Sequence, residues 1–252
     1  MRCPVIYIKK GAPPTSVAIK VAEIKRNPSW RDIPEVRPED PETQLGYGST
    51  LRSYFEQLSK DDLREAMLKE QHYLCAYCMR SLPNKESVRI EHWYPLSKAR
   101  DTAIDYQNLL AVCEGVYSDQ QQRQPCCDNS KSDKEIQLDP RNQAMMDHIQ
   151  YESNGTLYFD APTWMGQDDK KMIDSDIKDT LRLNGMDSEL TIGRRIVWNR
   201  SRDLLDSLRK KGKCTASNVE LLIQKIEEQE KYPQYAGVML FYYKRWLRNH
   251  SK

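Results

Sequence analysis

The sequence has no long hydrophobic run, so nothing in it predicts a membrane-spanning helix. Its 252 residues are 38% hydrophobic and 30% charged, and no apolar segment approaches the roughly 18 residues that such a helix needs. The apolar segment 5–8 is too short for a signal-peptide core, and its lysines follow it rather than precede it. We therefore expect a cytoplasmic protein with no membrane partner, in which residues 5–8 form a strand.

An excess of charge of one sign is also lacking. The chain has 39 basic and 37 acidic residues, which gives a formal net charge of +2. A uniformly basic surface that attracts phosphates everywhere is therefore excluded. Any contact with nucleic acid must come from local patches.

The seven cysteines do not suit a disulfide framework, because such frameworks belong to small secreted chains. Five of them lie in one stretch, namely Cys75, Cys78, Cys113, Cys126 and Cys127. The Cys-x-x-Cys spacing of Cys75 and Cys78 lets two thiolates reach one zinc ion. We predict that Cys113 and Cys127 complete a structural Zn²⁺ site. Cys126 is the alternative to Cys127, and free buried cysteines or a redox pair are the alternatives to zinc.

Three regions of the chain differ in composition, and together they predict an α+β fold. Residues 1–49 hold seven of the thirteen prolines and should form an extended, proline-rich arm with little helix, because proline fixes φ and removes a donor. Residues 50–140 should contain two leading helices and then short strands around the cysteines. Residues 141–252 should contain a hairpin followed by helices.

Local patterns predict individual elements within these regions. Apolar spacing predicts a helix from Thr50, and Ser59 with Asp62 resembles a capping box that begins a second helix. Strand cores are expected at 87–90 and 109–112, and the sequence Asn154-Gly155 predicts a tight hairpin turn between 149–152 and 156–159. Near the end of the chain, a helix capped by Ser217 and a last, aromatic-rich helix over 235–248 are expected.

A group of polar residues is interleaved with the cysteines. In chain order they are Glu91 and His92, then Asn108 before Leu109-Leu110, then Asp128 with Asn129, and finally Lys131. This order of residue types inside a cysteine frame resembles the HNH, or ββα-metal, nuclease motif. The resemblance implies an HNH core with structural zinc and an endonuclease that hydrolyses phosphodiester bonds. The chain departs from the family pattern at Asp128, where histidine is frequent.

The resemblance assigns catalytic roles to three of these residues. His92 is the expected general base, because imidazole titrates near neutral pH. Glu91 and Asp128 are expected to hold a catalytic Mg²⁺ or Mn²⁺, because hard cations prefer oxygen ligands. Asp128 in place of histidine argues against softer metals at this site.

Three further residues have supporting roles in this interpretation. Asn108 is expected to brace the loop that bears His92 through side-chain to backbone hydrogen bonds; the alternative is an ordinary turn asparagine. Lys131 and Asn129 are expected to contact a substrate phosphate. The alternative for Lys131 is a solvated lysine with no partner.

Segments outside the motif extend the resemblance over most of the chain. Residues 1–14, 70–78 and 181–184 look like those of the retron-associated HNH endonuclease family, which includes the nuclease subunit of Septu antiphage systems. The family implies an antiviral defence effector that works with an ABC/SMC-like ATPase and, in some systems, with a retron reverse transcriptase and its DNA. On this basis, residues 12–48 are predicted to dock onto the ATPase.

Two other functions remain open at this point. The chain could be a stand-alone HNH enzyme for DNA processing or restriction, or a zinc-ribbon binding module without catalysis. The base flanked by acids, Glu91-His92 with Asp128, argues against the binding module. DNA is the expected substrate and RNA the alternative, because hydrolysis at phosphate reads no base.

Overall fold

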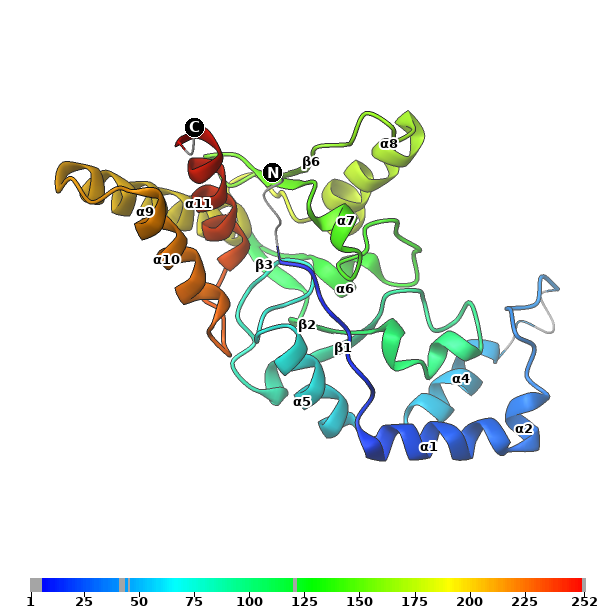
Figure 1. The fold of residues 1–252 in the computed structure, drawn as a ribbon. Helices are drawn as coiled ribbons and strands as arrows, with labels where there is room; N and C mark the ends of the chain where they lie inside the picture. Colours follow the sequence, from blue (N-terminus) through cyan, green and yellow to red (C-terminus); the bar gives the residue numbers. More distant parts are fainter. Residues whose placement is uncertain (1–5, 41–43, 45, 120–121, 251–252) are drawn as a thin grey trace.

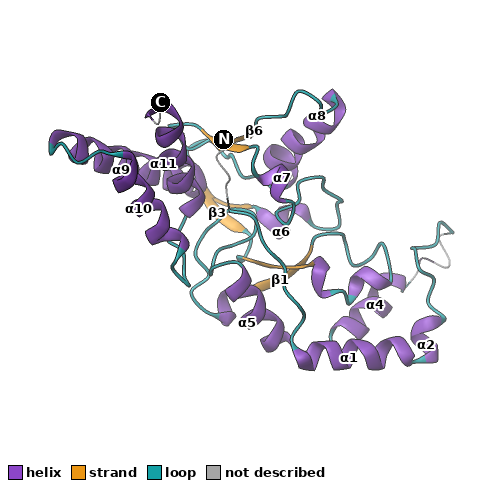
Figure 2. Cartoon of the chain, in the orientation of Figure 1, coloured by secondary structure: helices purple, strands orange, loops and turns teal. Residues whose placement is uncertain are grey.

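The computed structural model describes residues 6–40, 44, 46–119 and 122–250, and the protein has an α+β fold (Figure 1). The α-helices are α1 (Thr15–Arg26), α2 (Pro28–Arg31), α4 (Tyr47–Phe55), α5 (Lys60–Glu70), α6 (Cys127–Lys131), α7 (Gln143–Met146), α8 (Gln167–Ser175), α9 (Glu189–Lys210), α10 (Ala216–Glu227) and α11 (Ala236–His250). The strands are β1 (Arg89–His92), β2 (Leu109–Val112), β3 (Val116–Asp119), β4 (Gln122–Pro125), β5 (Ile149–Tyr151) and β6 (Leu157–Phe159). They form three two-stranded antiparallel sheets that pair β1 with β2, β3 with β4 and β5 with β6 (Figure 2). Within the described residues, every helix is too short or too polar to cross a membrane.

The extended arm predicted for residues 1–49 is wrong between residues 15 and 31, where the chain forms α1 and α2. The prolines begin these helices instead of preventing them: Pro14 precedes α1, and Pro28 is the first residue of α2. A proline at a helix start costs little, since the first N–H groups of a helix have no partner within it. Val17 and Ile24 then bury one face of α1. Residues 1–5, 41–43 and 45 of the predicted arm lie outside the described residues.

The strand predicted at residues 5–8 is also wrong for residues 6–8, which belong to no strand. Ile8 is buried, and its N–H donates to the carbonyl of Pro140 at 2.8 Å. A single hydrogen bond of this kind satisfies the backbone without forming a ladder. Val5 lies outside the described residues.

Both helices predicted after the arm are confirmed. α4 begins at Tyr47, slightly earlier than the apolar pattern suggested, and buries Leu51 and Phe55. α5 is capped as predicted, because the Ser59 side chain accepts the N–H of Asp62 at 3.4 Å. These two helices form one wall of the cavity described below.

The central sheet places two of the predicted site residues at the end of a strand. β1 and β2 are antiparallel, with Glu91 opposite Leu110 and His92 opposite Leu109. The strand predicted at 109–112 is confirmed, and all of its residues are buried. The strand predicted at 87–90 begins two residues later, at Arg89, because residues 85–87 form a 3-10 turn. In this turn the Asn84 side chain accepts the N–H of Ser87.

The hairpin and helices predicted for the carboxy-terminal region are confirmed, with one displaced cap. Gly155 in the β5–β6 turn has φ +92°, and a Cβ there would lie 2.0 Å from the carbonyl of Thr191 in α9. Only glycine fits this turn, which packs directly on the helix. The side chain that caps α10 belongs to Thr215 rather than to Ser217, so the capping pattern was displaced by two residues.

Hydrogen bonds join the carboxy-terminal region to the cysteine-bearing turns. Tyr235 donates its N–H to the carbonyl of Met79, which follows Cys78, at 2.9 Å. Cys127 donates its N–H to the carbonyl of Leu181 at 3.0 Å. Residues from all parts of the described chain share one hydrophobic core.

Candidate metal centre and active site

Four cysteine side chains meet in the interior. Cys75 and Cys78 come from the turn after α5, Cys113 follows β2, and Cys127 is the first residue of α6. Their Sγ–Sγ distances are 3.9 Å for Cys75–Cys127, 3.8 Å for Cys113–Cys127 and 3.7 Å for Cys78–Cys113. Zn–S bonds of about 2.3 Å in a tetrahedron separate the sulfurs by about 3.8 Å. The predicted four-cysteine cluster is confirmed, its fourth member is Cys127, and its geometry can hold a metal ion such as zinc.

The cysteine cluster is closed to solvent and has a cation at its edge. Its four members are at most 6% exposed. Arg80 Nη2 lies 3.1 Å from Cys113 Sγ and 3.6 Å from Cys126 Sγ. Burial disfavours the charge on Arg80, but the neighbouring thiolates of Cys78 and Cys113 outweigh this effect and raise its pKa. Arg80 thus offsets part of the negative charge of the cluster, a role that no sequence spacing signalled.

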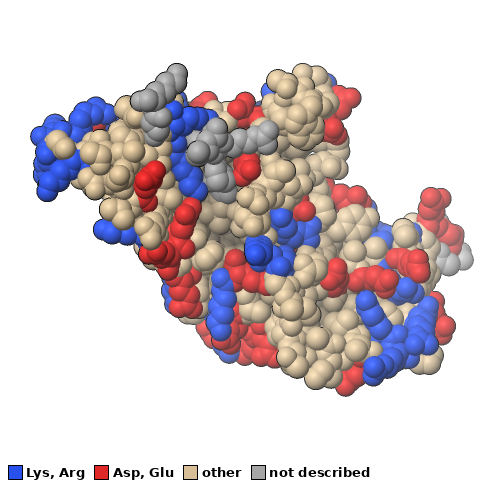
Figure 3. Space-filling view, viewed as in Figure 1, with Lys and Arg blue, Asp and Glu red and all other residues tan. Residues whose placement is uncertain are grey.

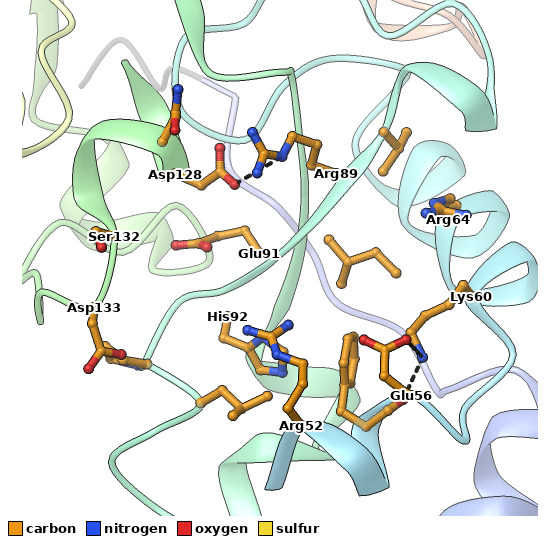
Figure 4. Close-up of a pocket in the computed structure, with 16 residues that line it drawn as sticks. Arg52, Glu56, Lys60, Arg64, Arg89, Glu91, His92, Asp128, Ser132 and Asp133 are labelled. Atoms are coloured by element: carbon orange, nitrogen blue, oxygen red, sulfur yellow. Dashed lines mark hydrogen bonds and ion pairs between the residues drawn. The ribbon is translucent and has the colours of Figure 1, made fainter. Parts of the chain in front are cut away.

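Next to the cluster the surface opens into a cavity of about 580 Å³ (Figure 4). Side chains from α4, α5, β1 and α6 contribute to its wall. Its charged and polar lining residues are Arg52, Glu56, Lys60, Arg64, Arg89, Glu91, His92, Asp128, Asn129, Ser132 and Asp133. The fold thus brings Glu91, His92, Asp128 and Asn129 to one cavity, as the motif predicted, whereas Asn108 and Lys131 do not line it.

His92, at the end of β1, is buried with its ring edge-on against Phe55, the centroids 4.6 Å apart. Its Nε2 lies 3.0 Å from the carbonyl oxygen of Ala103. A carbonyl only accepts, so Nε2 carries the proton and Nδ1 of the neutral ring does not. Burial lowers the pKa of His92 to about 4, with the charge of Arg52 acting in the same direction. At neutral pH the ring is an uncharged imidazole able to accept a proton at Nδ1.

Asn108 fastens the loop that follows His92. Its Oδ1 accepts the N–H of Tyr94 at 2.8 Å, and its Nδ2 donates to the carbonyls of Tyr94 at 2.8 Å and Thr102 at 3.0 Å. The side-chain to backbone hydrogen bonds predicted for this asparagine are therefore present. They fix the chain at Tyr94, two residues after His92, and at Thr102, directly before the residue whose carbonyl contacts the His92 ring.

Lys131 lies behind the cavity and is fully buried. Its Nζ lies 2.7 Å from Glu91 Oε1 and donates to the carbonyl of His92 at 3.0 Å. The prediction that Lys131 contacts a substrate phosphate is therefore wrong, and so is the alternative of a solvated lysine. Because α6 directs it inward, its ammonium needs a carboxylate partner, which Glu91 supplies.

Glu91 and Asp128 contribute carboxylates from β1 and α6 to the same cavity. Burial raises the pKa of both groups; the contact with Lys131 opposes this in Glu91, and the charge of Arg89 opposes it in Asp128. Glu91 Oε1 pairs with the Lys131 ammonium and also accepts a hydrogen bond from the Tyr77 hydroxyl at 3.2 Å. Asp128 Oδ1 is buried without a hydrogen-bond partner among the described residues, while Oδ2 lies 3.5 Å from Arg89 Nε. An unpaired carboxylate oxygen near a second carboxylate fits a hard cation such as Mg²⁺ or Mn²⁺.

Gly115 allows the chain to close tightly behind Asp128 and Asn129. Its φ is +73°, and a Cβ there would lie 2.5 Å from Asn129 Cβ and 2.9 Å from Asp128 Oδ1. Its carbonyl accepts the N–H of Cys126 at 2.7 Å. The position therefore requires glycine. No local sequence pattern signals this requirement, because it comes from the approach of α6 to Gly115.

Three basic residues on α4 and α5 were missed by the sequence reading. Figure 4 shows Arg52 extending toward His92, with Lys60 and Arg64 on the α5 side of the cavity. Lys60 pairs with Glu56 at 3.4 Å, and Arg64 with Asp61 at 3.5 Å. Arg52 forms no ion pair with any described residue. The amphipathic pattern put these residues on the polar sides of their helices, but it could not reveal that those sides face β1.

Comparison of the chain with models of known protein families finds no match, and no curated protein matches it significantly.

Proposed function

We propose that this protein is a metal-dependent nuclease of the HNH class. The observation that carries the proposal is the convergence of Glu91, His92 and Asp128 on one open cavity beside a buried four-cysteine cluster. A neutral imidazole that shares a cavity with two carboxylates and several cations suits hydrolysis of a phosphodiester bond.

The residues of the cavity have separate tasks in this reaction. His92 accepts a proton from the attacking water at Nδ1, while the Ala103 carbonyl holds the ring through Nε2. Glu91 and Asp128 would hold the Mg²⁺ or Mn²⁺, which when bound supplies charge neutralisation at the phosphate and the leaving oxygen. Lys131 holds the Glu91 carboxylate and the His92 carbonyl in fixed positions through its ammonium group.

The cations at the cavity supply the affinity for a phosphodiester backbone. Arg52 is the best placed, because it extends toward His92 and has no acidic partner among the described residues. Lys60 and Arg64 would add to the local positive field despite their pairing with acids. This local patch accounts for nucleic-acid binding by a chain with a net charge of only +2.

The wider role is also a proposal and depends on the family resemblance alone. On that basis the protein is the nuclease effector of a Septu or retron-type antiphage complex, with an ABC/SMC-like ATPase as its partner. A stand-alone HNH enzyme would cut without that partner. A zinc-ribbon module without catalysis is less favoured, because it has no use for a buried base beside an unpaired carboxylate oxygen.

His92→Ala is the variant that tests the proposed chemistry. Purified protein, alone and with the products of neighbouring genes, is incubated with Mg²⁺ and plasmid DNA or transfer RNA. We expect His92→Ala to lower cleavage by at least about 100-fold, since a general base contributes roughly 10²–10⁴-fold, while the protein stays folded and keeps its zinc. His250→Ala, at an exposed position near the end of α11, is the matched control. Undiminished cleavage by His92→Ala would show that His92 is not the general base.

A further inference from the structure

The long helix α9 reaches one end of the molecule, where a short turn leads into α10 (Figure 1). α9 has 22 residues, and the last of its buried side chains belongs to Leu205. Residues 209–213 therefore lie beyond the part of the helix that packs on the body. This end of α9 is therefore open to contact with a partner outside the chain.

Four basic side chains crowd this end, and we call them the basic tip: Arg209, Lys210, Lys211 and Lys213, all exposed. Figure 3 shows Lys and Arg gathered at the end of the molecule formed by α9. Arg209 Nη1 lies 3.3 Å from Asp206 Oδ1, whereas the three lysines form no ion pair with the described residues. A chain of net charge +2 thus concentrates four cations within five residues.

The turn that carries the basic tip has a defined conformation. Gly212 has φ +67°, and a Cβ added there would meet no atom within 4 Å. The Asn218 side chain donates to the carbonyl of Lys213 at 2.7 Å, and the Thr215 hydroxyl accepts the N–H of Asn218 at 3.3 Å. These hydrogen bonds hold the backbone of the turn at Lys213, and the space around its glycine is open. A partner backbone can approach this turn closely.

The residue types around the basic tip narrow down its partner. Residues 202–218 contain no aromatic side chain, whereas single-stranded nucleic acids are bound largely through stacking on aromatic rings. Lysine charges without stacking surfaces fit the phosphates of a duplex, which need no base contact. We propose that the basic tip binds the phosphate backbone of duplex DNA. The choice of nucleic acid over an acidic protein rests on the proposed nuclease function.

The test measures binding rather than cleavage, so the two proposals can fail separately. Full-length protein and the variant Lys210→Gln/Lys211→Gln/Lys213→Gln are titrated against a labelled DNA duplex by fluorescence anisotropy, with Ca²⁺ in place of Mg²⁺. Each lost phosphate contact should reduce the slope of log affinity against log salt by about 0.9. We expect the slope to fall by about 2 to 3 and the affinity near 0.1 M salt to fall at least about tenfold.

The matched control removes two lysines from an acidic setting, the half-buried Lys170 and the exposed Lys171. The control variant is Lys170→Gln/Lys171→Gln on α8, whose first turn also carries Asp168 and Asp169. It should change duplex affinity by less than about twofold. An unchanged salt slope in the triple variant would overturn the proposal, as would a loss confined to single-stranded DNA. A larger loss on duplex RNA would overturn the choice of DNA. Tip-dependent binding by a protein that cuts nothing would keep the proposal and reject the nuclease.

Discussion

The cysteine cluster and the neighbouring cavity are two possible metal sites of opposite construction. The cluster offers four soft sulfur ligands, all of them buried. The cavity offers two carboxylates and an imidazole in an open space of about 580 Å³. Closed four-sulfur sites hold structure, whereas sites with an open position allow chemistry. Under the proposed function, the closed cluster serves stability and the open cavity serves catalysis.

The helix α6 joins the two sites, because its first residue, Cys127, belongs to the cluster and its second, Asp128, belongs to the cavity. Lys131, one turn later, anchors Glu91 from behind. Loss of the cluster should therefore disorder the cavity as well. Changes in the cavity should leave the cluster intact, and this asymmetry is open to experiment.

The largest expected effect comes from breaking the closed site. Cys75→Ser should remove zinc and unfold or aggregate the protein, because structural zinc contributes folding free energy of roughly 10 kcal/mol or more. Purified protein should contain about one zinc per chain. Metal analysis and thermal denaturation measure both quantities.

The remaining cysteines provide the controls for this experiment. Cys214→Ser lies outside the cluster and should keep zinc and the melting temperature. Cys126→Ser should also keep zinc, since Cys126 is not one of the four clustered sulfurs. A metal-free protein that stays folded and active would contradict a structural role for the cluster.

An intermediate effect is expected at the link between the two sites. Lys131→Met should lower the free energy of unfolding by about 3 kcal/mol, because it leaves the buried carboxylate of Glu91 without its cation. Zinc should remain bound. Chemical denaturation measures the change, and Lys134→Met, at an exposed position three residues later, should cost less than about 0.5 kcal/mol. Equal stability of the two variants would mean that Lys131 is not needed to hold Glu91.

The smallest effect is expected at the edge of the open site. Arg52→Ala should lower kcat/KM for nucleic-acid cleavage by about tenfold, the loss expected from one charged contact of roughly 1.4 kcal/mol. Stability should change little, because the side chain is exposed. The control is Lys69→Ala, an exposed position on α5 outside the cavity lining. If both variants cleave at the wild-type rate, Arg52 does not contact the substrate.

Features fixed by neighbouring residues could be predicted from the sequence. The Cys-x-x-Cys turn, the Ser59 cap and the Asn154-Gly155 hairpin each depend on geometry within a few residues. The grouping of Glu91, His92 and Asp128 around one cavity was predictable as well, because the motif orders them around the cysteine pairs.

Features fixed by packing between distant segments could not be predicted. The sequence predicts a solvated or phosphate-binding lysine at Lys131, because only the fold brings Glu91 on β1 against it. Arg80 and Arg52 have no distinctive spacing, and their importance comes from what lies across from them. The prolines of residues 1–49 predicted little helix, but Thr15–Arg26 contains no proline and forms the helix α1.

The hydrogen bonds that run from the cysteine turns to the carboxy-terminal region decide how this chain can be dissected. Cys127 donates its N–H to Leu181, and Met79 accepts from Tyr235, so residues 50–140 depend on partners supplied much later in the chain. Cys127 is completely buried, and losing its partner would cost about 1–3 kcal/mol. Residues 50–140 are therefore a poor cassette for transplantation into another protein, and fusions that seek to reuse this site should carry the chain at least through α11.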